Sequence, residues 1–298
     1  MRCSEDMLFF VVADRWNCYN MDMKKEQIRI CERGCHMNNV NRTLYIPLYG
    51  KAYVSKKNII LHDSMAEAIW EKEGFNLKGK SKSKWLAYDM AMHSAVYDEW
   101  VKQEIASHSD AVVLHVGCGM DSRIKRIGEK DTLWYDIDFP AVIEERRKYY
   151  HETNFYHMLS ADMRLDKWES SIERNQAAIV ILEGVTMYFK PEELIALLSN
   201  ICQYFKSVKL LMDCYTEHAA KISKYKNPIN DVGVSVVYGY DDPQKLATKT
   251  GYIFEKEHWV TPQKYIDELQ GMEKIIFQNL FAGKIAKSMY RMYEFKKR

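Results

Sequence analysis

Short apolar runs alternate with helix-like segments along the chain from about residue 111 onwards. Residues 111–116, which include His115, and residues 178–182 are short, mostly apolar runs, and each is followed by a turn or a charged residue, as is typical of buried strands. Further segments with strand composition cover residues 132–137, 155–159 and 208–212. Pro140 and Pro191 each stand where a helix is expected to begin after a strand. This alternation predicts an α/β fold in which a parallel sheet carries helices on its faces.

The last part of the chain follows a different pattern. Residues 252–259 and 289–295 have strand composition, and residues 263–286 between them are predicted to be helical. Two closing strands after the five earlier ones predict a seven-stranded, mostly parallel sheet whose last strand is antiparallel. The first 110 residues are predicted to be mainly helical, with apolar residues at helical spacing over 64–70 and 85–105.

Composition and charge narrow the class of protein. Of the 298 residues 47% are hydrophobic and 28% charged, which is typical of a globular protein. Lysine and arginine number 43 against 41 acidic residues, a net charge of +2, so we expect no nucleic-acid partner. The lysine-rich run 78–84 is predicted to be a flexible hinge; a nucleic-acid patch is the alternative.

The N-terminal residues and the cysteines suggest a cellular location. The apolar run 7–13 is too short to span a bilayer, and Glu5 and Asp6 outweigh Arg2 where a signal peptide would be positive. The seven cysteines are irregularly spaced, which favours reduced thiols over disulfides. We therefore expect a cytoplasmic protein with no membrane partner.

A metal site near the start of the sequence is a rival hypothesis. Cys31, Cys35 and His36 offer three ligands, with Cys18 as a fourth. Their spacing is not a standard zinc pattern and no second pair follows, so we expect no metal.

A glycine-rich turn follows the first predicted strand. Gly117 and Gly119 would let the backbone turn tightly and approach a ligand closely. A nicotinamide-binding turn has a third glycine where this chain has Ser122, and Asp121 beside it would repel a pyrophosphate. The turn therefore predicts a ligand without phosphates and disfavours a nicotinamide oxidoreductase.

Acidic residues follow three further predicted strands. Asp138, 21 residues after Gly117, can accept hydrogen bonds from ribose hydroxyls or cap the Pro140 helix, and Asp136 is a second candidate. Asp162 can receive an adenine amino group or simply occupy a surface turn. Glu183 directly follows an apolar strand, where a carboxylate is costly unless a cationic group pairs with it. An adenosine that carries an amino acid would use all of these groups.

These motifs together resemble the leucine carboxyl methyltransferase family, which also holds the tetracenomycin-type polyketide O-methyltransferases. The resemblance covers roughly residues 41–296 and rests on four ordered motifs, at residues 117–123, 135–140, 161–163 and 183–188. It implies a Rossmann-like methyltransferase with an N-terminal helical cap. The implied domains are an arm of uncertain order (1–40), a helical, acceptor-side cap (41–105) and a donor-binding core (106–298).

The resemblance also implies the cofactor, S-adenosylmethionine, and its product, S-adenosylhomocysteine. The cofactor-binding residues that it implies are Gly117 and Gly119 beneath the amino-acid part, Asp138 at the ribose, Asp162 and Met163 at the adenine, and Glu183 at the α-ammonium group. The family places an arginine for the cofactor carboxylate on the helix before the first strand, but residues 85–101 contain none. His93 aligns best with that position, and Lys84 is another candidate substitute.

The resemblance favours methylation of a carboxylate on a small molecule or a peptide. A carboxylate is already ionised at neutral pH and needs no general base, whereas a hydroxyl acceptor would need one. Tyr188, whose offset from Glu183 matches the family's acceptor-side tyrosine, and His93 are the catalytic candidates. The alternative function is a catalytically silent protein that binds S-adenosylmethionine as a sensor or partner.

The acceptor pocket is expected between the cap and the stretch 221–240. Tyr225, Tyr238 and Tyr240 are candidate lining residues, although Tyr225 is more typical of an ordinary aromatic residue. Both segments are polar, and we expect them to form a lid.

Overall fold

The computed structural model describes residues 40–73, 83–127, 131–174, 176–223, 237–283 and 288–298. The chain forms two compact units, each built from three segments. One unit comprises the described residues of Met1–His93, His218–Val237 and Thr261–Met289, and the other comprises those of Ser94–Glu217, Tyr238–Val260 and Tyr290–Arg298. The domain bounds expected from the sequence stay a prediction, and residues 1–39 of the expected arm lie outside the described residues.

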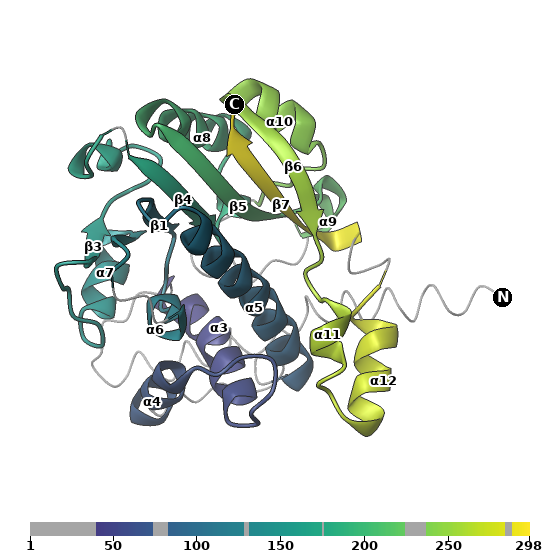
Figure 1. The fold of residues 1–298 in the computed structure, drawn as a ribbon. Helices are drawn as coiled ribbons and strands as arrows, with labels where there is room; N and C mark the ends of the chain where they lie inside the picture. Colours follow the sequence, from purple (N-terminus) through teal and green to yellow (C-terminus); the bar gives the residue numbers. More distant parts are fainter. Residues whose placement is uncertain (1–39, 74–82, 128–130, 175, 224–236, 284–287) are drawn as a thin grey trace, which may run out of the picture. The chain divides into compact units, whose positions relative to one another are not determined.

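The second unit contains a seven-stranded sheet in the order β3-β2-β1-β4-β5-β7-β6 (Figure 1). The strands are β1 (Val112–Val116), β2 (Trp134–Asp138), β3 (Tyr156–Ser160), β4 (Ala177–Leu182), β5 (Ser207–Tyr215), β6 (Tyr252–His258) and β7 (Tyr290–Lys297). β1 to β5 pair in parallel, and β7 pairs antiparallel with both β5 and β6. The predicted α/β fold, with a mostly parallel sheet and an antiparallel last strand, is therefore confirmed.

The apolar runs form the inner strands because helices cover both faces of this sheet. All five residues of β1 are buried, as are the last five of β4. The remaining elements of this unit are α6 (Arg123–Ile127), α7 (Pro140–Arg146), the 3-10 helices η3 (Trp168–Ser171) and η4 (Thr186–Tyr188), α8 (Pro191–Tyr204) and α10 (Pro243–Thr250). α8 and α10 lie side by side against the half of the sheet that holds β5 and β6 (Figure 1).

The parallel register brings the predicted site residues to one edge of the sheet. His115 of β1 pairs with Asp136 of β2 and with Ile181 of β4. The carboxyl ends of the three strands are therefore level, and the residues that follow them meet at this edge. It is here that an open α/β sheet usually binds its ligand.

The first unit is helical. Its elements are α3 (Val40–Ser55), α4 (Ser64–Glu73), the start of α5 (Lys84–Ser107), most of α9 (Glu217–Ser223), α11 (Gln263–Ile266) and α12 (Gly271–Leu280). Glu273 ties α12 to α5: its carboxylate accepts a hydrogen bond from the Tyr88 hydroxyl at 2.5 Å and pairs with Lys84 Nζ at 2.6 Å. Trp85 stacks on Phe281 with ring centroids 5.5 Å apart.

The prediction of a helix over 263–286 is wrong in one respect. The structure has two helices here, α11 and α12, separated by four residues. Gly271, the first residue of α12, has a φ of 53°, outside the right-handed helical region, so one continuous helix cannot run through it. Residues 284–287 lie outside the described part of the chain.

Within the described ranges, none of the helices combines the length and the apolar character needed to cross a bilayer. The cysteines of the described residues, Cys118, Cys202 and Cys214, are buried free thiols.

Candidate active site

The turn after β1 brings the backbone unusually close to the segment that follows β4. Gly117 and Gly119 have φ angles of 73° and 51°, in the left-handed region that favours glycine. A Cβ atom on Gly117 would lie 2.7 Å from Cγ2 of Val185, so a larger residue would clash there. The predicted tight turn is therefore present, and the close neighbour that the structure shows is Val185; the approach to a ligand stays a prediction.

Asp138 ties this turn to the end of β2. Its carboxylate accepts hydrogen bonds from the backbone N–H of Gly119 at 2.8 Å and of Phe139 at 2.7 Å. The N-cap of α7 is Phe139, which has no side-chain cap, so Asp138 does not serve as the helix cap. Burial raises the pKa of Asp138, and the two N–H groups oppose that rise. Asp138 lies level with the glycine turn, as a ribose-binding residue should.

Asp136, the second ribose candidate, is committed to a buried polar network. Its carboxylate pairs with Arg146 and accepts hydrogen bonds from Trp134 Nε1 at 2.9 Å and the Tyr156 hydroxyl at 2.6 Å. His115 Nδ1 lies 3.3 Å from its Oδ1 atom. Asp136 is completely buried, so it holds β1, β2 and β3 together rather than facing a ligand.

Arg146 links this network back to the glycine turn. Its Nη1 atom donates a hydrogen bond to the carbonyl oxygen of Gly119 at 3.0 Å, and its guanidinium lies 4.1 Å from the ring centroid of Tyr150. The orientation of the turn therefore depends on α7 as well as on β2.

Glu183, which directly follows β4, has a cationic partner within the chain. Arg123 at the start of α6 donates a hydrogen bond from Nη2 to Oε2 of Glu183. Arg123 is completely buried, and Glu183 keeps 14% of its side chain exposed. The expectation that a carboxylate here needs a cation is thus met by a residue that the sequence analysis did not single out.

Arg123 belongs to a set of charged and polar side chains that we name the arginine–carboxylate cluster. Its members are Ser94, Asp98, Asp121, Arg123, Arg126 and Glu183. The Asp98 carboxylate accepts a hydrogen bond from Nε of each arginine at 2.7 Å. The Asp121 carboxylate accepts one from Nη1 of Arg126 at 2.7 Å. The available signal in the sequence was the pair of arginines three residues apart, immediately after the glycine motif.

The predicted adenine residues follow β3. Met163 is buried, whereas Asp162 is partly exposed and its carboxylate accepts hydrogen bonds from Arg164 Nε at 2.8 Å and Nη2 at 2.7 Å. These hydrogen bonds lower the pKa of Asp162. The surface-turn interpretation of Asp162 therefore holds, and its role toward adenine stays a prediction.

Tyr188 ends η4, close in sequence to Glu183, and 37% of its side chain is exposed. Asp213 on β5 organises this segment: both of its carboxylate oxygens accept the backbone N–H of Gly184, at 2.8 and 2.9 Å. Removal of the hydroxyl group from water and then the negative charge of Asp213 raise the pKa of Tyr188 to about 12. Tyr188 is therefore protonated at neutral pH and can donate a hydrogen bond but not act as a base.

Two of the expected lining tyrosines lie next to η4. The backbone N–H of Tyr238 donates to the carbonyl of Met187 at 2.9 Å, and the Tyr240 hydroxyl donates to the carbonyl of Phe189 at 3.0 Å. Tyr225 lies outside the described residues, as do residues 74–82 and 224–236 of the two segments expected to form a lid, and the lid stays a prediction. His93 lies on α5 but belongs to the helical unit, so its catalytic role stays a prediction.

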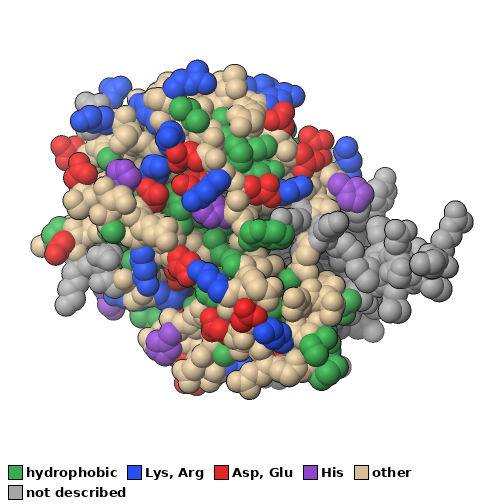
Figure 2. Space-filling view, turned by 45° about the vertical axis from the view of Figure 1, so that its right-hand side comes forward, with side chains coloured by type: hydrophobic (Ala, Val, Ile, Leu, Met, Phe, Trp, Pro, Cys, Tyr) green, Lys and Arg blue, Asp and Glu red, His purple; other side chains and the backbone are tan. Residues whose placement is uncertain are grey.

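The residues of the metal hypothesis lie in a part of the chain that the structure does not describe. No group of three or more potential metal ligands occurs among the described residues, and Cys18, Cys31, Cys35 and His36 lie outside them. On the face shown in Figure 2, the described lysine and arginine side chains are interspersed with acidic ones rather than gathered in a basic patch.

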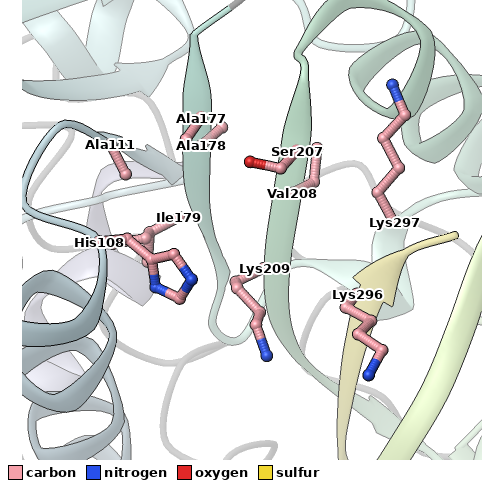
Figure 3. A pocket seen from close by; sticks show the side chains of 10 residues that line it. All are labelled: His108, Ala111, Ala177, Ala178, Ile179, Ser207, Val208, Lys209, Lys296 and Lys297. Carbon is pink, nitrogen blue, oxygen red and sulfur yellow. The ribbon is translucent and has the colours of Figure 1, made fainter.

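A cavity of about 130 Å³ lies at the opposite ends of the strands from the glycine turn. Its lining comes from the end of α5, the starts of β4 and β5, and the end of β7, with His108, Lys209, Lys296 and Lys297 among the lining residues (Figure 3). Lys209 and Lys296 both pair with Glu255 at 2.8 Å. None of the site residues predicted from the motifs lines this cavity.

Comparison with known proteins gives three kinds of similarity. The family model of the leucine carboxyl methyltransferases matches residues 33–202. The tetracenomycin polyketide synthesis O-methyltransferase TcmP of Streptomyces glaucescens is 28% identical over 228 residues, which cover 75% of this chain and 83% of TcmP. The S-adenosyl-L-methionine-dependent methyltransferase dpfgK of Gibberella zeae is 25% identical over 236 residues, which cover 71% of this chain and 79% of dpfgK.

Among solved structures, a protein of Thermobifida fusca YX with a provisional assignment as a methyltransferase has a TM-score of 0.50 at 12% identity. The aligned part covers 84% of this chain and 94% of the Thermobifida fusca chain. This likeness concerns the fold, and the family match confirms the resemblance that the sequence motifs indicate.

Proposed function

The chain belongs to the leucine carboxyl methyltransferase family, and from this premise we propose that it transfers the methyl group of S-adenosylmethionine to a carboxylate oxygen of a small molecule or peptide. The observation that carries the proposal is the sheet order β2-β1-β4. It puts Asp138 and Glu183 on either side of the glycine turn. A donor that lies across this turn can offer its ribose to one carboxylate and its amino acid to the other.

The donor side would use backbone and carboxylates together. In this proposal Gly117 and Gly119 pass beneath the amino-acid part, Asp138 accepts hydrogen bonds from the ribose hydroxyls and Glu183 binds the α-ammonium group. Asp162 and Met163 complete the adenine end, where Arg164 already orients the Asp162 carboxylate. When bound, the donor supplies a methyl group on a positively charged sulfur.

The acceptor side needs to position an oxygen rather than to activate it. Methyl transfer is an in-line displacement, so most of the catalysis comes from holding the two reactants in the right geometry. Because Tyr188 is protonated at neutral pH, its hydroxyl can donate a hydrogen bond to an ionised carboxylate. That property suits a carboxylate acceptor better than a hydroxyl, which needs a base.

The first experiment is calorimetric titration with S-adenosylmethionine and S-adenosylhomocysteine. We expect Asp138→Ala to weaken binding of both about 10- to 100-fold, since hydrogen bonds to a charged group contribute about 1.5–3 kcal/mol. Asp131→Ala is the matched control, because Asp131 is an exposed residue just before the opposite end of β2. Equal binding by the wild type and Asp138→Ala would contradict the assignment of the ribose site.

Methyl transfer from a labelled donor to a panel of carboxylates then tests the chemistry. A carboxyl methyl ester releases its label as methanol in alkali, whereas a methyl ether keeps it. Alkali-labile product would support the proposal, and alkali-stable product would identify a hydroxyl acceptor. Donor binding without any transfer would favour the silent binding protein instead.

The proposal includes a reducing compartment, the cytoplasm. Cys118, Cys202 and Cys214 are buried free thiols, which suits a protein that never meets an oxidising environment. Cell fractionation tests this assignment, and recovery in a secreted fraction would contradict it.

A further inference from the structure

Arg123 is the most deeply buried cation of the arginine–carboxylate cluster. It contacts three carboxylates: Asp98 Oδ1 at 2.7 Å, Asp121 Oδ2 at 3.2 Å, and Glu183 Oε2. Burial lowers the pKa of Arg123, but Glu183, Asp121 and Asp98 outweigh that effect and raise it above its ordinary value. The guanidinium therefore stays charged at every pH at which the protein is folded.

The guanidinium is also fixed from several directions. Its Nη2 atom donates to Ser94 Oγ on α5 at 3.0 Å, and its Nη1 atom lies 3.5 Å from His115 Nε2 on β1. Tyr97, one helical turn after Ser94, lies with its ring centroid 5.3 Å from the guanidinium carbon. A planar group held in this way presents its remaining contact, with Glu183, in one orientation.

Glu183 gains two properties from this contact. A buried carboxylate at the end of an apolar strand is costly unless a cationic group pairs with it. Without a partner it would also sample several rotamers, each of which points its oxygens differently. The contact with Arg123 offsets that cost and orients Glu183 at the edge of the sheet.

We propose that Arg123 is a positioning residue for the amino-acid end of the methyl donor, and that it acts through Glu183. This inference rests on the proposed function, in which Glu183 binds the α-ammonium group. It makes a selective claim: Arg123 matters for ligands that carry the amino acid, and matters little for the adenosine end, which meets Asp138 and Asp162.

Two ligands separate these ends of the site. S-adenosylmethionine carries both the adenosine and the amino acid, whereas 5′-methylthioadenosine carries the adenosine without the amino acid. We expect Arg123→Lys to weaken S-adenosylmethionine binding about 10- to 100-fold and to change 5′-methylthioadenosine binding less than about 2-fold. Arg126→Lys is the matched control, since Arg126 pairs with the same Asp98 and Asp121 and lies on the same helix. We expect it to change either affinity less than about 3-fold.

A double-mutant cycle tests whether Arg123 acts through Glu183. If it does, Arg123→Lys weakens S-adenosylmethionine binding much less when Glu183 is already glutamine, because the two changes remove the same interaction. Losses that simply multiply would overturn the proposal. So would equal weakening of both ligands, which would indicate a general effect on the fold, or an unchanged affinity for S-adenosylmethionine.

The wild-type titrations keep the two proposals apart. A wild type that binds neither ligand would overturn the proposed function, and the role of Arg123 with it. A wild type that binds both, beside an Arg123→Lys variant that binds equally well, would overturn the role of Arg123 alone.

If Arg123→Lys fails to fold, Ser94→Ala is the deciding variant, because it removes only one acceptor of the guanidinium. A selective loss for S-adenosylmethionine then supports the proposal, and no loss or an equal loss overturns it.

Discussion

Two aspartates of β2, two residues apart, do different work. Asp138 keeps its carboxylate at the edge of the sheet, where two backbone N–H groups orient it. Asp136 is completely buried; burial raises its pKa, but Arg146, His115 and Tyr156 outweigh that rise and lower the pKa to about 2. Both residues are buried, but Asp138 orients the glycine turn, whereas Asp136 joins neighbouring strands; the role of Asp138 toward a ribose stays a prediction.

We expect Asp136→Asn to lower the free energy of unfolding at pH 7 by about 3–5 kcal/mol, because it leaves the buried Arg146 without its counter-charge. Asp131→Asn, at an exposed position before the same strand, should change it by less than about 0.5 kcal/mol. Urea unfolding measures both values.

The difference in unfolding free energy between the wild type and Asp136→Asn should depend on pH. The pKa of Asp136 is about 2 in the folded state against 3.8 ordinarily, so its contribution is complete above about pH 4 and is lost as the pH falls towards 2. The stability difference between the wild type and Asp136→Asn should therefore narrow by about 2 kcal/mol over that interval. A difference that stays constant from pH 7 to pH 2.5 would show that Asp136 does not carry this charge.

At the residue scale, the sequence singled out residues that carry a local signal and missed contacts between distant segments. Gly117, Asp138 and Glu183 were singled out because each follows a recognisable strand at a characteristic offset. The contact of Arg123 with Asp98 was not, because it joins α6 to α5 across 25 residues and no local pattern encodes it.

The element that most constrains the site is the turn between β1 and α6. It combines a positive φ at Gly117 with the close approach of Val185 from the segment after β4. The turn thus depends on both the local backbone and a distant element.

We expect Gly117→Ala to lower the free energy of unfolding by about 2–4 kcal/mol, from the strained φ and from overlap with Val185. Gly184→Ala is a matched comparison: Gly184 has a similar φ of 69°, but nothing lies within 4 Å of its added Cβ. It should cost about 1 kcal/mol, the conformational part alone. Equal losses in the two variants, measured by chemical denaturation, would show that the close approach is unimportant.

The strands were predictable to within a few residues because a sheet that is buried on both faces needs continuous apolar runs, which are easy to recognise. The region 263–286 was harder. Its apolar residues keep helical spacing through the break between Ile266 and Gly271, and the positive φ at Gly271 is a property of the folded backbone. Spacing alone does not reveal such a break.

At the scale of the whole molecule, the two compact units share one long helix. The first part of α5 belongs to the helical unit, and the part from Ser94 onwards belongs to the unit with the sheet. Each unit also takes three separate segments of the chain, so neither is a continuous piece of the sequence.

We expect a single cooperative unfolding transition, in which a change in one unit alters the other. Glu273→Gln, which weakens the contacts of α12 with Lys84 and Tyr88 in the helical unit, should lower the free energy of unfolding by about 1 kcal/mol. Hydrogen exchange measured by mass spectrometry should then show reduced protection in β1 and β4 as well as in α12. Reduced protection confined to the helical unit would contradict this coupling.

The position of β7 between β5 and β6 has a consequence for how the protein is made. β5 ends at Tyr215, but its antiparallel neighbour begins only at Tyr290, and β6 has β7 as its partner in the sheet. A ribosome adds about 5–20 residues per second, so the edge of β5 waits for about 4–15 s before its partner is synthesised. Throughout that interval a strand with an apolar centre offers unpaired backbone groups to any neighbouring nascent chain. The unpaired edge of β5 is therefore exposed to aggregation before synthesis ends, and a chaperone that binds the nascent chain on the ribosome would protect it in this interval.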